Sequence, residues 1–278
     1  MVVGKRGGLV VWGRSIDGRA RKSVLQGTDG LEIRPTAVDD TLHTMARKPP
    51  GLFITGSDTG VGKTYVAAMI ARALRAEGHT VGVYKPVASG CRRRQGGLIS
   101  DDAGMLWKAA GRPGELDRVC PQMFRAPLAP HLAAAEEGRR VDARLLRSGV
   151  RYWQARCDTV LVEGAGGLMS PLTDDEYNAD LAMDLGYPLV IVVPNRIGAI
   201  NQALQTLIAA ATFRTGLPLA GVVLNQPAAE TTADLSIESN GRELAARSVA
   251  PLLAEVQCGD RRFRSAISWM EIAQLKRP

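Results

Sequence analysis

The chain has 278 residues, of which 45% are hydrophobic and 23% are charged, and its formal net charge is +7. This composition is ordinary for a soluble globular protein with a substantial core. No apolar stretch approaches the roughly 20 residues that cross a bilayer, so we expect no membrane partner. The basic residues are mostly dispersed, and the chain has only four Phe that could stack on bases, which argues against a nucleic-acid partner. Four widely spaced cysteines favour reduced thiols in a cytoplasmic protein.

The first 48 residues differ from the rest because their short apolar pieces follow no clear period. They end in Lys48-Pro49-Pro50, a natural boundary, and Met45 lies just before it. We therefore expect residues 1–48 to be an extension that is either disordered or the product of a misassigned start. The same reasoning assigns 49–258 to the main domain and 259–278 to a C-terminal tail.

From Gly51 onward, short apolar strands alternate with amphipathic helices. We predict strands at 52–55, 81–84, 159–162, 189–193, 219–224 and 252–256. We predict helices at 63–76, 101–110, about 142–155, 178–185, 200–213 and 237–247. This alternation indicates a single α/β domain with a doubly wound, mostly parallel sheet and helices on both faces. Ligands of such sheets bind at the carboxyl ends of the strands.

A glycine-rich loop follows the first of these strands, with the sequence GSDTGVGKT from Gly56 to Thr64. Its backbone N–H groups and the start of the next helix form the type of cradle that binds nucleotide phosphates. Lys63 would reach the outer phosphates and the Thr64 hydroxyl would bind Mg²⁺. Five residues separate Gly56 from Gly62, one more than in the common pattern. A chance turn is the simpler alternative, and the loop alone specifies no reaction.

Three further charged residues lie at strand or loop ends: Lys85 and Glu163 directly follow predicted strands, and Asp101 begins a predicted helix. Asp101 and Glu163, together with Thr64, would supply hard oxygen ligands for Mg²⁺. Lys63 and Lys85 would place two positive charges around a phosphoryl group in transfer. Each has a simpler alternative: Lys85 as a solvated lysine, Asp101 as a helix N-cap like Ser100, and Glu163 as a structural carboxylate.

The lengthened loop resembles the G-T-D-T-x-V-G-K-T loop of dethiobiotin synthetases, with Ser57 where Thr is usual. The resemblance continues in order to Asn225 and leaves residues 1–48 and the tail without a counterpart. Its further motifs are YKPVASG at 84–90, SD at 100–101, PH at 130–131, VEGAGG at 162–167, GAIN at 198–201 and GVVLN at 221–225.

That resemblance implies a P-loop NTPase fold and a homodimeric cyclo-ligase of biotin biosynthesis, dependent on ATP and Mg²⁺. Its substrates would be 7,8-diaminopelargonate, CO₂ and ATP. The reaction would pass through a carbamate and a carbamic-phosphoric anhydride before ring closure to dethiobiotin.

The resemblance also implies roles for individual residues. Lys63 and Lys85 would be catalytic. The nucleotide would contact Asp58, Thr59, Gly60, Val61, Gly62, Lys63, Thr64, Glu163, Gly166 and Asn225. The metal ligands would be Thr64, Asp101 and Glu163. The substrate would contact Lys85, Ser89, Gly198, Ala199, Ile200 and Asn201, of which the last four would come from the other subunit.

Some of these residues, and two further features of the sequence, have simpler interpretations. Ser89 could cap a turn, and Asn225 could be an ordinary turn residue. His131 is interpreted as structural. The basic segment 91–97 is either a mobile solvated loop or an attractor of an anionic substrate.

Three rival functions remain. A partition or positioning ATPase would carry an extra lysine five residues before Lys63, where this chain has Asp58. A related amidoligase would need a glutaminase domain with a nucleophilic cysteine. A catalytically dead nucleotide-binding module is disfavoured because all five candidate catalytic and metal-binding residues are present, namely Lys63, Thr64, Lys85, Asp101 and Glu163. The sequence leaves open ATP versus CTP and any oligomer beyond a dimer.

Overall fold

The computed structural model describes residues 9–14, 20–25, 48–227 and 234–275. The chain forms two compact units, residues 1–46 and 47–278. In the first, β1 (Leu9–Arg14) pairs antiparallel with β2 (Ala20–Leu25), two strands that the sequence did not predict. The rest of the first 46 residues lies outside the described residues, so the expected disorder there stays a prediction.

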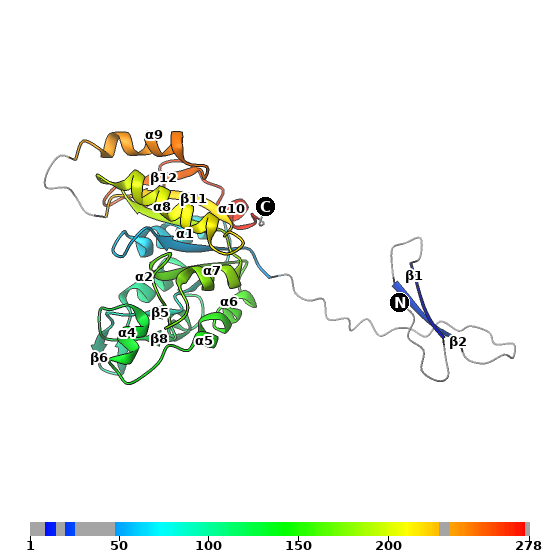
Figure 1. The fold of residues 1–278 in the computed structure, drawn as a ribbon. Coiled ribbons are helices and arrows are strands. Elements are labelled where there is room, and N and C mark those ends of the chain that lie inside the picture. Colours follow the sequence, from blue (N-terminus) through cyan, green and yellow to red (C-terminus); the bar gives the residue numbers. More distant parts are fainter. Residues whose placement is uncertain (1–8, 15–19, 26–47, 228–233, 276–278) are drawn as a thin grey trace. The chain divides into compact units, whose positions relative to one another are not determined.

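The second unit, whose fold Figure 1 shows, is built on a six-stranded sheet. The order of its strands is β12-β11-β10-β3-β9-β4. Every neighbouring pair in it is parallel, which confirms the predicted α/β class. The strands are β3 (Gly51–Gly56), β4 (Val81–Tyr84), β9 (Thr159–Gly167), β10 (Leu189–Pro194), β11 (Leu219–Asn225) and β12 (Leu252–Val256).

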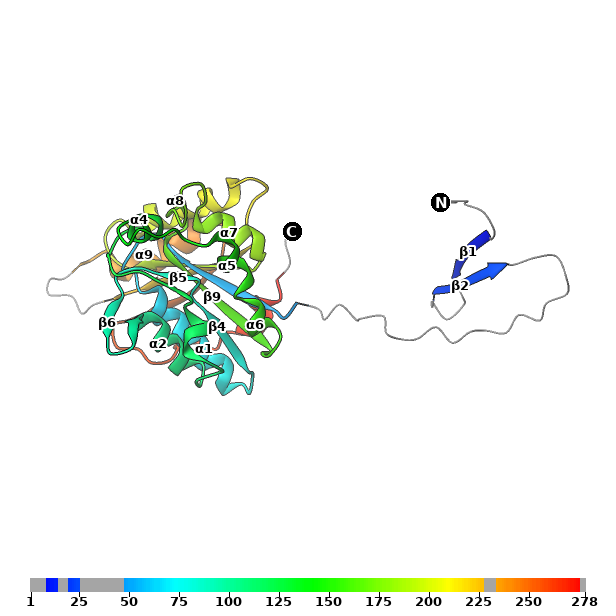
Figure 2. The ribbon, with the colours of Figure 1, turned by 90° about the horizontal axis from the view of Figure 1, so that it is seen from below.

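Helices cover both faces of this sheet, and Figure 2 shows α1 and α2 on one side with α7 and α8 on the other. The helices are α1 (Lys63–Ala76), α2 (Asp101–Ala109), α3 (Leu116–Val119), α4 (Pro130–Ala135), α5 (Ala143–Ser148), α6 (Arg151–Gln154), α7 (Asn178–Leu185), α8 (Ala199–Thr212), α9 (Ile237–Arg247) and α10 (Trp269–Ala273). Two short pairs complete the unit: β5 (Val87–Ala88) with β8 (Gln122–Met123), and β6 (Arg92–Arg94) with β7 (Gly97–Ile99).

Most predicted elements appear within one or two residues of their expected bounds, but the helix predicted at about 142–155 is two helices, α5 and α6. The break falls at Gly149, where an added Cβ would lie 2.3 Å from the Tyr84 hydroxyl oxygen. That hydroxyl donates a hydrogen bond of 2.8 Å to the Leu145 carbonyl. The strand beneath therefore interrupts the helix, which periodicity along the chain could not indicate.

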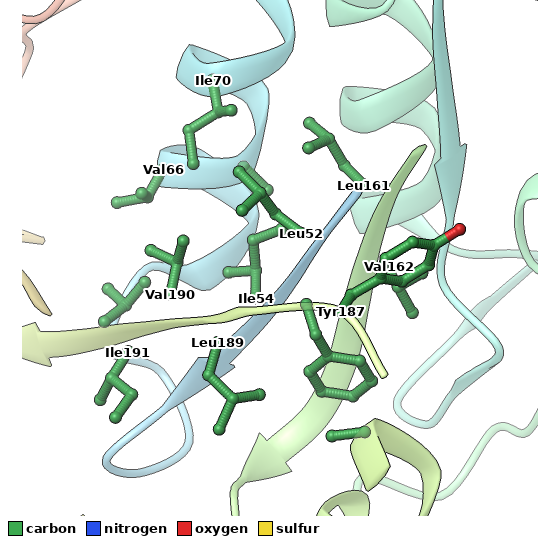
Figure 3. Close-up of a cluster of buried hydrophobic side chains, with 14 of the residues drawn as sticks. Leu52, Ile54, Val66, Ile70, Leu161, Val162, Tyr187, Leu189, Val190 and Ile191 are labelled. Atoms are coloured by element: carbon green, nitrogen blue, oxygen red, sulfur yellow. The ribbon is translucent and has the colours of Figure 1, made fainter. Parts of the chain in front are cut away.

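The core surrounds β3, the central strand that leads into the glycine-rich loop. All six residues of β3 are buried, which explains why it reads as a continuous apolar run. Figure 3 shows side chains of β3, α1, β9 and β10 packed together around it. Labelled there are Leu52, Ile54, Val66, Ile70, Leu161, Val162, Tyr187, Leu189, Val190 and Ile191. This packing fixes the point from which the loop starts.

The segment predicted as a C-terminal tail packs onto this unit as far as it is described, to Leu275. Helix α10 contacts both β3 and α1. Its first residue, Trp269, is only 1% exposed, and its ring lies 5.0 Å from that of Phe263 between centroids. The tail therefore contributes to the core.

Candidate active site

The glycine-rich loop joins β3 to α1 and adopts a backbone that only glycine tolerates well. Gly60 and Gly62 have φ values of 75° and 89°. A Cβ on Gly62 would also lie 2.1 Å from Nδ2 of Asn225, whereas one on Gly60 would meet no atom within 4 Å. The glycine at position 62 is therefore required both by the backbone and by its neighbour.

Hydrogen bonds hold the loop in place from several sides. The Ser57 backbone N–H donates to the Val192 carbonyl at 2.9 Å. Asn225 donates from Nδ2 to the Val61 carbonyl at 2.8 Å, and Lys63 donates from Nζ to the Asp58 carbonyl at 3.1 Å. Among the described residues, Oδ1 of Asn225 is buried without a hydrogen-bond partner. This oxygen is free to accept a hydrogen bond from a ligand.

A charged cluster lies at the carboxyl ends of β4 and β9, with Lys85 and Glu163 buried and the Asp102 side chain 47% exposed. Lys85 follows β4, is 4% exposed, and places Nζ 2.6 Å from Oε1 of Glu163 and 2.9 Å from Oδ2 of Asp102. The Thr64 hydroxyl, at the start of α1, donates to the same Glu163 oxygen at 2.8 Å. The cluster thus joins three of the residues that the sequence singled out: Thr64, Lys85 and Glu163.

The two buried lysines have pKa values shifted in opposite directions. Burial lowers the pKa of Lys63 below its ordinary value, and the positive charge of Lys85 lowers it further against the pull of Glu163. Burial alone would also lower the pKa of Lys85, but Glu163 and Asp102 outweigh burial and raise it. Desolvation would raise the pKa of Asp102, yet Lys85 holds it below its usual value. Lys85 is therefore a permanently charged partner of two carboxylates.

The structure differs from the sequence prediction at Asp101, which we expected to lie beside Thr64 and Glu163. Its carboxylate instead pairs with Arg92 at 2.5 Å, and both side chains are more than 60% exposed. Asp102 is the residue that reaches Lys85. Successive helical residues point about 100° apart, so only one of two adjacent aspartates at the start of α2 can face the cluster. Ser100, whose hydroxyl accepts from the Ala103 N–H at 3.2 Å, is the N-cap of this helix.

The sequence did not single out Asn178 and Ser170, two residues that shape the loop after Glu163. Gly166 has a φ of 80°, and the Asn178 side chain at the start of α7 hydrogen-bonds to the backbone around it. Ser170 accepts from the Gly167 N–H at 2.8 Å through its hydroxyl oxygen. Both residues lie in stretches without a recognisable motif, so spacing gave no signal for them.

The predicted substrate segment at 198–201 begins α8. Gly198 has a φ of 91°, Ala199 is buried, Ile200 is half-buried and Asn201 is exposed. One turn on, Gln202 accepts a hydrogen bond of 3.2 Å from the Ser57 hydroxyl, which ties α8 to the glycine-rich loop of the same chain. Ser89 is half-buried after β5, and no hydrogen bond joins it to the charged cluster among the described residues.

Other singled-out features lie outside this cluster. The basic segment forms an antiparallel pair, β6 with β7, whose arginines are exposed. His131 lies in α4, and its Nδ1 is buried without a partner in the described part of the chain.

A cavity of about 1080 Å³ lies between α1 and the segment 259–269, and none of the predicted site residues lines it. All four cysteines are free thiols, and burial raises the pKa of Cys120 to about 12.

Several curated proteins with similar sequences are described as ATP-dependent dethiobiotin synthetases. The chain is 44% identical over 216 residues to the ATP-dependent dethiobiotin synthetase of Rhodopirellula baltica, covering 74% of this chain and 83% of the relative. It is 40% identical over 209 residues to the enzyme of the same description from Aromatoleum aromaticum, covering 75% and 91%. The chain belongs to the dethiobiotin synthetase family. A family model described as an AAA domain also matches residues 50–260.

Solved structures give weaker similarities. A ParA family ATPase from Chlorobium tepidum matches with a TM-score of 0.45 and 17% identity, covering 76% of this chain and 84% of that one. The signal recognition particle receptor FtsY from Elizabethkingia anophelis matches with a TM-score of 0.44 and 16% identity, covering 84% and 67%. Similarities of this size support no functional argument. The partition-type alternative is therefore not favoured over the dethiobiotin synthetase family.

Among the residues that the structure describes, every helix is too short or too polar to span a membrane. Nor do three or more His, Cys, Asp or Glu side chains gather there as a ready-made metal site. A Mg²⁺ ion needs fewer protein ligands than this, because it keeps several waters and binds substrate phosphates.

Proposed function

We propose that this chain is an ATP-dependent dethiobiotin synthase, a cytoplasmic cyclo-ligase that converts 7,8-diaminopelargonate, CO₂ and ATP into dethiobiotin, ADP and phosphate. The observation that carries the proposal is the buried Lys85, held between Glu163 and Asp102 beside a nucleotide loop, in a chain 44% identical to enzymes of that description. Lys85 supplies a positive charge where negative charge develops on the oxygens in such a reaction.

The reaction has three steps. One amine of the substrate attacks CO₂ and loses a proton, giving a carbamate. A carbamate oxygen then attacks the γ-phosphorus of ATP and displaces ADP. The second amine attacks the carbonyl carbon of the resulting anhydride, loses a proton and expels phosphate, which closes the cyclic urea.

The protein contributes positioning and charge to these steps, and no covalent protein nucleophile is needed. Lys63 at the start of α1 binds the outer phosphates after exchanging its Asp58 carbonyl partner for them. Lys85 orients the carbamate and neutralises charge on its oxygen during attack. Charged Lys85 is available for this because Glu163 and Asp102 raise its pKa.

The residues present fit a Mg²⁺ ion. Thr64, Asp102 and Glu163 offer hard oxygen atoms, and Oε2 of Glu163 is buried without a hydrogen-bond partner in the described chain. We propose Thr64 and Glu163 as ligands, with Asp102 in the place expected for Asp101. When bound, the ion would neutralise charge on the phosphate oxygens.

The remaining predicted contacts complete the site. The nucleotide lies along Asp58–Thr64 and Gly166, and Asn225 binds the adenine through its free Oδ1. Ser89 contacts the substrate, and the free N–H groups at the start of α8 bind its carboxylate. In a homodimer this α8 segment, residues 198–201, comes from the partner subunit.

An omission assay tests the reaction. ADP release is measured with 7,8-diaminopelargonate, bicarbonate and Mg²⁺, each left out in turn, and dethiobiotin is identified by mass. We expect turnover to need all three. Turnover that ignores the diamine would contradict the proposal.

A subunit-mixing assay tests the shared site. Lys63→Ala removes the phosphate contact, and Asn201→Glu places a repelling charge where the substrate carboxylate would bind. If each site uses both subunits, unfolding and refolding the two inactive variants together restores about a quarter of wild-type activity, because half of the dimers are mixed and each has one intact site. No recovery above the separate variants would mean that each site lies within one chain.

A further inference from the structure

Asn178 is a fully buried polar residue outside every motif in the sequence. It is the first residue of α7 and is 0% exposed. Its Nδ2 donates to the carbonyls of Ala165 at 2.6 Å and Gly167 at 2.9 Å, and its Oδ1 accepts from the Ala165 N–H at 3.1 Å. A longer hydrogen bond of 3.4 Å runs from Nδ2 to the Ser170 carbonyl, so one side chain binds the backbone of the loop after Glu163 at four points.

The surrounding backbone reinforces this attachment. The Asn178 N–H donates to the Ser170 carbonyl at 3.1 Å, and the Ala179 N–H donates to the Leu168 carbonyl at 3.0 Å. Gly164 leaves no room for a side chain, since an added Cβ would lie 2.7 Å from Oδ1 of Asn178. The start of α7 and the loop thus form one connected piece.

The same loop forms one wall of the nucleotide site. Gly167 pairs with Gly56 between β9 and β3, and the Leu168 N–H donates to the Gly56 carbonyl at 3.2 Å. A Cβ on Gly166 would lie 3.5 Å from Oγ1 of Thr59. A shift of this loop would therefore move the wall that faces the phosphate-binding residues.

We propose that Asn178 is a positioning residue, which sets the backbone of 164–168 against the glycine-rich loop and so fixes both Glu163 and the nucleotide. The inference rests on the proposed nucleotide-dependent function. A single amide suits this task because it alone offers both a donor pair and an acceptor to opposite backbone groups. A purely structural residue, by contrast, would stabilise the fold without affecting ligand affinity.

Two variants and one control separate these roles. Asn178→Ala removes all four side-chain hydrogen bonds. Asn178→Asp keeps the shape but turns an oxygen toward the carbonyls of Ala165 and Gly167. The matched control is Gln122→Ala, which also removes a buried amide bound to backbone, the N–H and carbonyl of Asp142, outside the site.

The readouts are the dissociation constant for MgATP by calorimetry, KM and kcat, and thermal unfolding. For Asn178→Ala we expect MgATP affinity and kcat each to fall about tenfold or more, as misplacement of binding groups does. Gln122→Ala should lower the unfolding temperature while its affinity stays within about twofold of wild type.

The Asp variant adds a pH signature. Facing two carbonyls in a buried site, its carboxyl group has a raised pKa and donates a hydrogen bond only when protonated. The affinity of Asn178→Asp, relative to wild type at the same pH, is therefore expected to recover between pH 8.5 and 6.

Affinities of both Asn178 variants within twofold of wild type would overturn the inference, as would an equal loss in Gln122→Ala. If Asn178→Ala does not fold, the pH dependence of Asn178→Asp decides. Failure of the wild-type protein itself to bind MgATP would instead refute the proposed function.

Discussion

At the scale of single residues, Lys63 and Lys85 have the same side chain and opposite electrostatic surroundings. Within the described part of the chain, Lys63 donates to a backbone carbonyl alone, whereas Lys85 lies between two carboxylates. Their pKa values are accordingly shifted in opposite directions. The same substitution at the two positions should therefore have different consequences.

Lys63→Ala and Lys85→Ala are each expected to lower turnover by ~10²-fold or more, by loss of an electrostatic contact to the reacting phosphoryl group. Only Lys85→Ala leaves a buried carboxylate, Glu163, without its cation, so it alone should also lower the free energy of unfolding by about 3–5 kcal/mol. Steady-state kinetics and urea denaturation measure the two effects. The double variant Lys85→Met/Glu163→Gln should regain the lost stability but remain inactive. Wild-type turnover in Lys63→Ala or Lys85→Ala would show that the substituted lysine has no part in the mechanism.

The lowered pKa of Lys63 predicts a pH dependence of nucleotide affinity. As pH rises through this lowered value, Lys63 loses its charge while Lys85 keeps its own, so MgATP affinity falls at a pH below the ordinary lysine value of about 10.4. Calorimetry from pH 7 to 10.5 measures this. Lys63→Arg, which stays charged, should show no such fall, and the same alkaline fall in that variant would assign it to another group.

At the scale of elements, the segment after β12 shows how a stretch without a motif can belong to the core. Trp269 of α10 is 1% exposed, and its Nε1 has no hydrogen-bond partner in the described chain. Trp269→Ala should lower the free energy of unfolding by about 3–5 kcal/mol, because it removes a large buried side chain.

Two further variants sharpen that prediction, all measured by urea denaturation. Trp269→Phe should cost less than Trp269→Ala, since it keeps part of the packing and removes the unpaired N–H. Leu275→Ala, at a side chain 48% exposed, should change stability by no more than about 0.5 kcal/mol. A change that small for Trp269→Ala would mean that α10 is not part of the core.

At the scale of the whole molecule, deleting the first of the two units tests whether the second is sufficient for activity. Residues 47–278 contain the six-stranded sheet and the charged cluster. Removing residues 1–46 should therefore leave turnover unchanged and the unfolding temperature within about 2 °C, as for a domain with its own core.

The cut must spare Lys48, whose Nζ lies 3.7 Å from the centroid of the Tyr187 ring. Removing residues 1–48 should cost about 0.5–1 kcal/mol more, the size of an exposed cation–π contact. Loss of activity on removal of 1–46 would show that the first unit takes part in function.

The sequence alone determined the six strands of the main sheet, most of the longer helices between them and the nature of the nucleotide loop. Those features are local: a run such as 52–55 reads as a buried strand, and Gly62, Lys63 and Thr64 are neighbours in the chain. The sequence also allowed Lys85 and Glu163 to be predicted as site residues, because parallel strands bring their carboxyl ends to one edge of the sheet. Their proximity follows from the fold class.

Tertiary structure decided what depends on packing between distant segments. It selected Asp102 over Asp101, since the rotation of α2 sets which aspartate meets Lys85. It brought Asn178 to the loop after Glu163 and split the helix at Gly149 against Tyr84. These contacts form only when helices pack against the sheet. A helix that turns by the angle of one residue, about 100°, would present a different side chain. No pattern along the chain specifies that rotation.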